Sequence, residues 1–307
     1  MAWYSLQRSS TGDGPQIDSE ASLLNGRYQL GARLGLGASA QVREAVDLRT
    51  GGTVAIKLIR LPALLSPAMR KEWVDRLRRE AQLARRLDHP DIVAIIEAGI
   101  RDGEAWLAME LVRGVDLGRY IQRHLLLPEV LVLRIAARVA GALAHAHGRG
   151  VVHRDLKPAN VLVNLANGQV KLADFGIARD PTADLTRTGL TLGTPTYMAP
   201  ELLAGAPANA ASDSYALGVL TFELLCGRRP HQASTLGELL RTIASQPPAS
   251  LASLRPDLPA PVVAAVETLL APDSADRPTD LAAWAAQIAG LAALMTRLLA
   301  PAKAPSL

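Results

Sequence analysis

The sequence is poor in cysteine, in aromatic residues and in surplus charge, and each shortage limits what the protein can be. Its 307 residues include one cysteine, Cys226, which excludes an internal disulfide and a zinc site built from several cysteines. Phenylalanine, tryptophan and tyrosine make up only 4% of the chain, so we expect an aliphatic core. The formal net charge of +4 is too mild to indicate nucleic-acid binding.

Targeting signals and long hydrophobic runs are missing as well. The first 20 residues are polar and do not follow the basic-then-apolar plan of a signal peptide. Residues 281–296 carry no charge, but they are rich in alanine and fall short of the about 20 strongly apolar residues of a spanning helix. We therefore expect a packed C-terminal helix here, no membrane span and a cytoplasmic protein.

Positive charge is concentrated in one part of the chain. Residues 57–87 contain nine lysines and arginines against three acidic residues, so their excess of six positive charges is larger than that of the whole chain. Among these charges, Trp73, Leu77 and Ala81 recur at helical spacing. Such a basic helix is either a solvated surface or a contact for a phosphate, a membrane surface or an acidic partner.

Hydrophobic patterning divides the chain into a strand-rich part and a helix-rich part. Short apolar segments before residue 113 predict five strands and one helix. After residue 116 the apolar segments are longer, follow a helical period and are separated by proline and glycine. The boundary is therefore expected near residues 113–116.

Two motifs in the strand-rich part are suited to binding phosphate. Residues 34–42 contain Gly35 and Gly37, whose small size lets backbone N–H groups approach phosphate oxygens. A strand rather than a helix follows, which excludes the dinucleotide-binding fingerprint. Lys57 ends the apolar segment Val54-Ala55-Ile56-Lys57, where burial is costly unless an anion is paired with it. Glu80 on the predicted helix is a natural counter-ion, and a surface lysine on an edge strand is the alternative.

The segment between residues 152 and 160 carries the most informative chemistry. It places Asp155, Lys157 and Asn160 on one loop, between a helix and a hairpin. A carboxylate there can orient a hydroxyl and take its proton, a lysine can neutralise a phosphoryl group, and an amide oxygen can bind a metal. Asp174, followed by Phe175-Gly176, stands nineteen residues beyond Asp155 and is suited to Mg²⁺.

Together these motifs resemble the signature of the protein kinases, in particular that of the bacterial Ser/Thr kinases. The resemblance covers residues 28–291 and also includes His89-Pro90-Asp91, Ala199-Pro200-Glu201 and Asp276-Arg277-Pro278. One departure is Ala40, which replaces the last glycine of the glycine-rich loop and should alter loop mobility only modestly.

The resemblance implies an α+β fold of two lobes, a small antiparallel β lobe with one main helix and a larger, mainly α lobe. On this sequence it implies a flexible leader over residues 1–26, an N-lobe over 27–112, a C-lobe over 113–293 and a tail over 294–307.

The same resemblance implies a role for each motif residue. Lys57 would hold the α- and β-phosphates of ATP and pair with Glu80, Asp155 would be the catalytic base, and Lys157 would contact the γ-phosphate. Asn160 and Asp174 would hold Mg²⁺, with Mn²⁺ as the alternative metal. The residues expected to bind ATP are Leu34, Gly35, Gly37, Val42, Ala55, Lys57, Met109, Glu110, Val112 and Leu162.

Substrate class and regulation are implied by the segment around the catalytic loop. Lys157-Pro158 and Gly193-Thr194 resemble Ser/Thr rather than tyrosine kinases, with Thr194 near Asp155. Thr186 and Thr188 stand where related kinases autophosphorylate, and unmodified loop residues are the alternative. Two structural roles complete the set: Glu201 would pair with Arg277, and Asp213 would brace the loop at His153.

The sequence therefore predicts transfer of the γ-phosphate of ATP to Ser or Thr of proteins, including the kinase itself. One alternative is a pseudokinase-type scaffold or regulatory nucleotide-binding protein, against which the intact Lys57, Asp155 and Asp174 argue. Another is a small-molecule phosphotransferase, a class that usually lacks the Ala199-Pro200-Glu201 segment. Besides protein substrates, the expected partners are a phosphothreonine-reading protein and a transient kinase homodimer.

Overall fold

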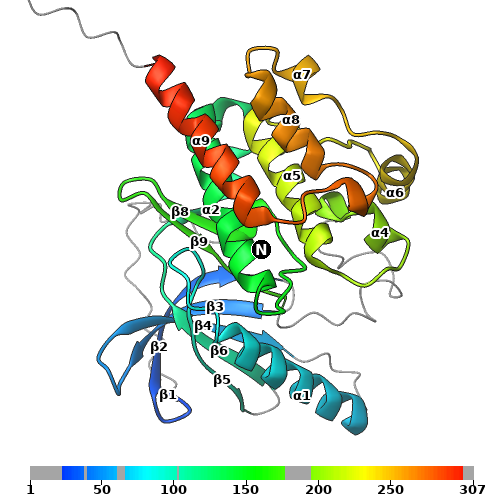
Figure 1. Ribbon diagram of the computed structural model, residues 1–307. Coiled ribbons are helices and arrows are strands. Elements are labelled where there is room, and N and C mark those ends of the chain that lie inside the picture. Colours follow the sequence, from blue (N-terminus) through cyan, green and yellow to red (C-terminus); the bar gives the residue numbers. More distant parts are fainter. Residues whose placement is uncertain (1–22, 38–39, 61–65, 102–103, 177–194, 300–307) are drawn as a thin grey trace, which may run out of the picture. The chain divides into compact units, whose positions relative to one another are not determined.

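The computed structural model describes residues 23–37, 40–60, 66–101, 104–176 and 195–299 (Figure 1). The chain forms two compact units. The first consists of the described residues of Met1–Asp116 and Leu162–Thr191, and the second of those of Leu117–Val161 and Leu192–Leu307.

A six-stranded antiparallel sheet is the framework of the first unit, with strand order β1-β2-β3-β4-β6-β5. Its most buried strand is β4, where every residue between the two ends is buried. The β-branched and aliphatic side chains of this strand fit such a position. The strands are β1 (Leu23–Leu24), β2 (Tyr28–Leu36), β3 (Ala40–Asp47), β4 (Thr53–Arg60), β5 (Ile95–Arg101) and β6 (Glu104–Glu110).

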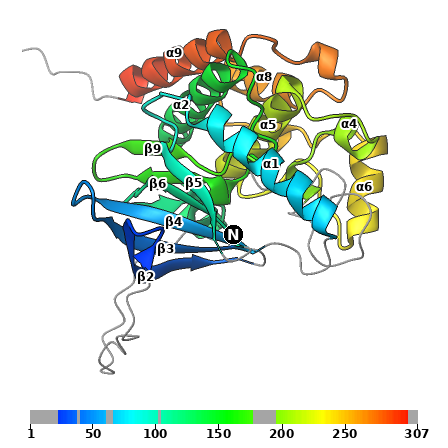
Figure 2. The same cartoon turned by 90° about the horizontal axis from the view of Figure 1, so that it is seen from below.

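Helix α1 (Pro67–Ala84) packs beside β5 in this unit (Figure 2). Its N-terminus is capped by Ser66, whose side chain accepts a hydrogen bond from the backbone N–H of Met69. Trp73, Leu77 and Ala81 are buried, as their helical spacing predicts. The exposed charged side chains, among them Lys71 and Arg78, lie away from these residues, whereas Glu80 is half-buried.

A second, three-stranded sheet also belongs to the first unit, in the order β7-β8-β9. Its strands are β7 (Val115–Asp116), β8 (Val161–Asn164) and β9 (Gln169–Leu172). Gly114 precedes β7 at a point where a Cβ atom would lie 2.5 Å from the carbonyl oxygen of Val163, so only glycine fits there. Leu172 accepts a hydrogen bond from Val93 and donates one to Asp91, which joins β9 to the segment before β5.

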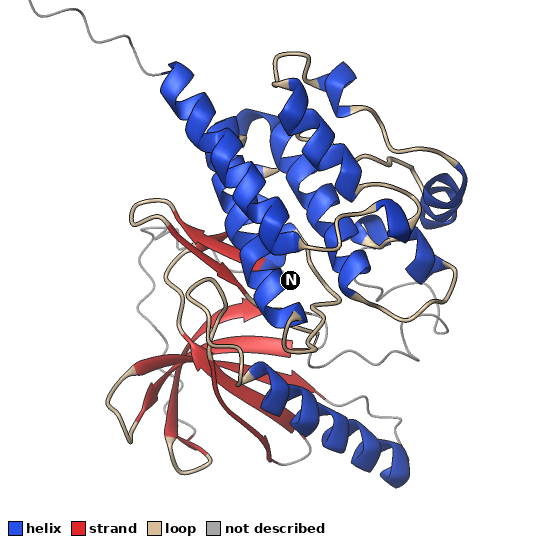
Figure 3. Ribbon diagram, viewed as in Figure 1, coloured by secondary structure: helices blue, strands red, loops and turns tan. Residues whose placement is uncertain are grey.

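The second unit is built from helices (Figure 3). Helix α5 is its central element, because nearly all of its residues are buried and it contacts α2, α7 and α8. A capping box formed by Asn209 and Ser212 begins α5, and Gly227, with a left-handed φ of 67°, ends it. The helices are α2 (Glu129–His147), α4 (Pro200–Leu203), α5 (Ala210–Cys226), α6 (Leu236–Ser245), α7 (Leu251–Leu254), α8 (Ala260–Leu269) and α9 (Leu281–Leu299).

Short one-turn helices complete the described chain. They are η1 (Leu117–Tyr120), η2 (Arg123–Leu125), η3 (Pro158–Asn160), η4 (Pro195–Tyr197) and η5 (Ser274–Asp276).

Three boundaries differ from the sequence-based prediction. Leu23 and Leu24 form β1 and pair with β2, although both fall within residues 1–26, where we expected a flexible leader. At the other end α9 continues to Leu299, although we expected a tail from residue 294. The first unit continues to Asp116, four residues beyond the expected end of the N-lobe at residue 112, and the segment from Leu162 returns to this unit because β8 pairs with β7.

Two of the described helices, α2 and α9, are long and apolar enough to cross a membrane by length and composition. The apolar window of α2 is 56% buried within the protein and that of α9 is 33% buried, and the two helices pack against each other. Length and composition alone are weak signs of a membrane span, because core helices of the same length have the same composition.

Candidate active site

The first unit contains a largely apolar cavity of about 110 Å³ where the nucleotide-binding residues were expected. Of the predicted set, Leu34, Ala55, Met109, Glu110, Val112 and Leu162 line it. Val42 belongs to the same buried cluster as Ala55 and Met109, although it does not line the cavity. The cavity has apolar walls and is bordered by residues 111–114, which join β6 to β7. Such a cavity suits a flat heteroaromatic ring.

The glycine-rich loop lies between β2 and β3 of the same sheet. Gly35 is paired with Val42, and the backbone N–H of Gly37 donates to the carbonyl of Ala40 at 2.8 Å. The tip of the loop, residues 38–39, is outside the described residues.

Lys57 and Asp174 form a short ion pair in the first unit. The Lys57 Nζ atom lies 2.6 Å from Asp174 Oδ1, with the two side chains 11% and 12% exposed. Two charges so deeply buried are tolerated because each neutralises the other. Lys57 comes from the middle of the sheet, where Val42 and Leu107 flank it on the neighbouring strands. Glu80 lies half-buried on α1, and its pairing with Lys57 stays a prediction.

The backbone at Asp174 is strained. Its φ is 60°, in the left-handed region that residues other than glycine rarely adopt. The hydrogen-bonded strand β9 precedes it and the buried Phe175 follows, so the chain is held on both sides. Strain of this kind is concentrated at functional sites, which agrees with the role predicted for this carboxylate.

The catalytic-loop residues come together in the second unit. Lys157 Nζ lies 2.8 Å from Asp155 Oδ2, and Asn160 Nδ2 donates to the same oxygen at 3.2 Å and to the Asp155 carbonyl at 2.7 Å. The backbone N–H of Asp155 donates to His153 Nδ1 at 3.2 Å. These contacts fix the direction of the Asp155 carboxylate, which the chemistry of a general base requires.

Metal binding is consistent with the side chains of these residues. The amide nitrogen of Asn160 donates hydrogen bonds to Asp155. The amide oxygen is therefore the atom of this side chain that could ligate a cation. Among the described residues no group of three or more His, Cys, Asp or Glu could hold a metal by itself. Proteins usually hold Mg²⁺ through one or two carboxylates together with substrate phosphates.

Asp213 on α5 supports the catalytic loop. It is 2% exposed, and its two oxygens accept hydrogen bonds from the backbone N–H groups of His153 at 2.8 Å and Arg154 at 2.9 Å. This is the contact expected for Asp213. Sequence reasoning missed His147, whose Nε2 lies 2.8 Å from Asp213 Oδ2. No feature of the sequence distinguishes His147 from any other histidine near the end of a helix.

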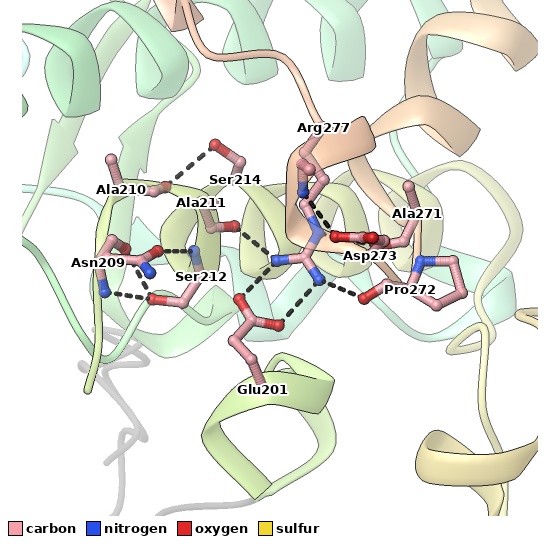
Figure 4. Close-up of polar contacts among 11 residues, drawn as sticks. Glu201, Asn209, Ala210, Ala211, Ser212, Ser214, Ala271, Pro272, Asp273 and Arg277 are labelled. Atoms are coloured by element: carbon pink, nitrogen blue, oxygen red, sulfur yellow. Dashed lines mark hydrogen bonds and ion pairs between the residues drawn. The ribbon is translucent and has the colours of Figure 1, made fainter. Parts of the chain in front are cut away.

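Glu201 and Arg277 form the ion pair expected from the sequence (Figure 4). The guanidinium bonds both carboxylate oxygens, with Nη1 2.6 Å from Oε1 and Nη2 2.9 Å from Oε2. Its other N–H groups donate to the carbonyls of Ala211, Ala271 and Pro272. The pair therefore ties α4 to the start of α5 and to the turn before α9.

Two further polar pairs were not predicted. Lys171 Nζ on β9 lies 2.7 Å from Glu110 Oε2, beside the cavity. A lysine flanked by Val170 and Leu172 carried the same signal as Lys57 and could have been found. Tyr197 donates its hydroxyl to Glu223 on α5. Burial raises the pKa of the Glu223 carboxyl, while the Tyr197 hydrogen bond and Arg229 act in the opposite direction.

Three predicted residues lie outside the described part of the chain. They are Thr186, Thr188 and Thr194.

Comparisons with known proteins identify the family. Residues 28–289 match the model of the protein kinase domain. The chain is 36% identical over 274 residues to the "Probable serine/threonine-protein kinase pknA2" of Bifidobacterium longum, covering 89% of this chain and 36% of that protein. It is 38% identical over 261 residues to "Serine/threonine-protein kinase PknA" of Mycobacterium tuberculosis, covering 83% of this chain and 58% of that protein. The chain thus spans about a third to three-fifths of the length of these curated relatives.

A solved structure agrees with the sequence comparisons. The kinase domain of Mycobacterium tuberculosis PknI superposes with a TM-score of 0.68 and 34% identity, over 88% of this chain and 98% of that one. The sheet-and-helix unit with its apolar cavity, the helical unit with its catalytic loop and the match over residues 28–289 lead to one conclusion. The chain belongs to the protein kinase family and has the protein kinase fold.

Proposed function

We propose that this chain is a serine/threonine protein kinase that transfers the γ-phosphate of ATP to serine and threonine hydroxyls of proteins. The observation that carries the proposal is the catalytic loop, where Lys157 and Asn160 orient the Asp155 carboxylate and Asp213 braces the backbone. The names of the longer relatives support the same activity.

The proposed reaction is an in-line displacement at phosphorus. The acceptor hydroxyl oxygen forms a bond to the γ-phosphorus while the bond from that phosphorus to the β–γ bridging oxygen breaks, and ADP leaves. Asp155 accepts the hydroxyl proton, and Lys157 neutralises charge on the transferring group. Lys57 holds the α- and β-phosphates. Mg²⁺ held by Asn160 and Asp174 would supply further charge neutralisation on the phosphates.

Two features of the sequence support serine and threonine as acceptors. These are Lys157-Pro158 after the catalytic aspartate and Gly193-Thr194, both typical of Ser/Thr kinases. Autophosphorylation on Thr186 or Thr188 belongs to the same proposal. Mass spectrometry of protein made in a host without related kinases, with and without Asp155→Asn, tests it. Phosphate that persists on the variant would rule out autophosphorylation.

Replacing Lys57 by methionine should reduce transfer from labelled ATP to a generic protein substrate by at least about 100-fold, because a cation aimed at the phosphates is lost. Arg49→Met, which removes an exposed cation from the turn between β3 and β4, should leave the rate within about twofold. If wild type labels neither itself nor the substrate, the scaffold alternative is supported instead. If Lys57→Met keeps full activity, the role given to Lys57 is wrong.

Replacing Ala55 by leucine should weaken ATP binding at least about tenfold, because the added carbons occupy the cavity that we assign to adenine. The matched control is Ala45→Leu, since Ala45 is also buried but belongs to the other hydrophobic cluster of the sheet. Both variants should lose about 1–3 kcal/mol of stability from overpacking. Calorimetric titration with MgATP separates them, and equal affinities would contradict the assignment of the cavity.

A further inference from the structure

The outward side of α1 carries exposed positive charge that has few counter-ions. The exposed cations of this helix and its C-terminal end are Arg70, Lys71, Arg78, Arg79, Arg85 and Arg86. Within the part of the chain that the structure describes, only Arg78 among them has a carboxylate within 4 Å, that of Asp75 at 3.9 Å. Lys71, Arg79, Arg85 and Arg86 form no ion pair with any residue that the structure describes.

The central charges follow one line along the helix. Residues 71, 75, 78, 82 and 85 are separated by alternating steps of four and three, which places them in a single row on an α-helix. With a rise of about 1.5 Å per residue, the row is about 21 Å long. Its side chains are Lys71, Asp75, Arg78, Gln82 and Arg85, and we call it the α1 row.

The opposite side of α1 packs against the sheet. The side chains of the α1 row therefore take no part in this packing. Trp73, Leu77 and Ala84 are 9%, 2% and 4% exposed, and the helix packs beside β5 (Figures 1 and 2). Like charges along one row repel each other and lower the stability of the helix slightly. An anionic partner would relieve this repulsion, and its approach would be accelerated by the local field.

The pattern of charges distinguishes between anionic partners. Nucleic acid presents negative charge at regular, short intervals, so its phosphates would be repelled by Asp75 in the middle of the row. The aromatic residue of the helix, Trp73, is buried and offers no platform for stacking bases. A helix that lies in a membrane surface presents a continuous apolar side outward, whereas among the described residues of α1 only the separate Met69 and Leu83 are large, apolar and exposed, and neither belongs to the α1 row.

A protein helix with carboxylates spaced seven residues apart matches the row. Lys71, Arg78 and Arg85 are themselves seven residues apart, so three carboxylates at that spacing could face all three cations. A hydrogen-bond donor such as a lysine on the same partner helix could face the Asp75 carboxylate. We propose that the α1 row is a docking surface for an acidic helical segment of a protein partner.

Docking here would act on catalysis through Glu80, which α1 also carries and which is predicted to pair with Lys57. This consequence depends on the proposed kinase function, but the binding does not. The docking proposal and the kinase proposal can therefore be tested separately. Binding is measured without ATP, and transfer from labelled ATP is measured without the partner.

The probe is a synthetic helical peptide with glutamate at every seventh position and a lysine placed to face Asp75. Its control is a peptide of the same composition in scrambled order. Fluorescence anisotropy with the full chain should give about tenfold tighter binding of the ordered peptide, because three exposed ion pairs form together. The difference should shrink at high salt. Equal binding of the two peptides would overturn the proposal.

Charge-reversal variants locate the contact. Arg78→Glu with Arg85→Glu should remove the preference for the ordered peptide, whereas Arg49→Glu with Arg241→Glu, which changes the net charge by the same amount at exposed positions outside α1, should retain it. Thermal unfolding of both variants shows that they are folded. The proposal is also overturned if a DNA duplex or a phosphatidylserine vesicle binds more tightly than the ordered peptide, or if both double variants lose the preference equally.

Discussion

Replacing Asp155 by asparagine should lower kcat for phosphate transfer by about 10²–10⁴-fold, with little change in the KM for ATP. The asparagine side chain has the same shape and can still accept a hydrogen bond from Lys157, so the loop geometry is expected to persist. What is lost is the ability to take a proton from the acceptor hydroxyl. Steady-state kinetics with labelled ATP and a generic protein substrate measures the effect.

The control for this experiment is Asp88→Asn, which removes an exposed carboxylate from the first unit. That variant should keep kcat within about twofold, and both variants should unfold at nearly the wild-type temperature. An Asp155→Asn protein that is folded and retains more than a tenth of wild-type activity would show that the hydroxyl proton leaves by another route.

Local motifs allowed much of this site to be predicted from the sequence. Asp155, Lys157 and Asn160 lie within six residues of one another, so their contacts are set by one loop. Six of the residues expected to bind ATP also line one cavity, although Val42 does not, and Ala55 and Met109 among them are paired on the neighbouring strands β4 and β6.

Pairings between distant segments were harder to predict. The need of Lys57 for an anion followed from its apolar neighbours, but Asp174 is 117 residues away in the sequence. Its approach depends on how β9 is joined to the segment before β5, which no local pattern shows. The hydrogen bond from Tyr197 to Glu223 was missed for the same reason, since residue spacing carries no information on contacts between η4 and α5, which are distant in the sequence.

The largest effect on stability is expected at Arg277. Its side chain is 0% exposed, it stacks over the Tyr215 ring at 5.0 Å, and its N–H groups donate to the Glu201 carboxylate and to three backbone carbonyls (Figure 4). A methionine of similar length can fill the space but satisfies none of these acceptors. Because the Glu201 carboxylate, only 18% exposed, and three backbone carbonyls would lose their donor, Arg277→Met should cost about 3–5 kcal/mol in the free energy of unfolding.

Arg255 provides a matched control for that measurement. It also forms a two-pronged ion pair, with Asp257, but the two side chains are 24% and 60% exposed. Water replaces the contacts with Asp257, so the ion pair itself should cost no more than about 1 kcal/mol in Arg255→Met, to which the hydrogen bond that Arg255 donates to the Leu225 carbonyl adds about 1 kcal/mol. Urea unfolding measures the loss of unfolding free energy in both variants. Equal losses would show that the burial of Arg277 does not make the Glu201–Arg277 pair more important for stability than an exposed pair.

The double variant Glu201→Met with Arg277→Met tests the physical reason for the loss. If the loss in Arg277→Met arises from leaving Glu201 without its cation, removing that carboxylate as well should recover part of the stability, although the carbonyls of Ala211, Ala271 and Pro272 still lack a donor. We therefore expect the double variant to be more stable than Arg277→Met by about 1–2 kcal/mol. A double variant less stable than either single variant would mean that packing against Tyr215, rather than charge pairing, accounts for the effect.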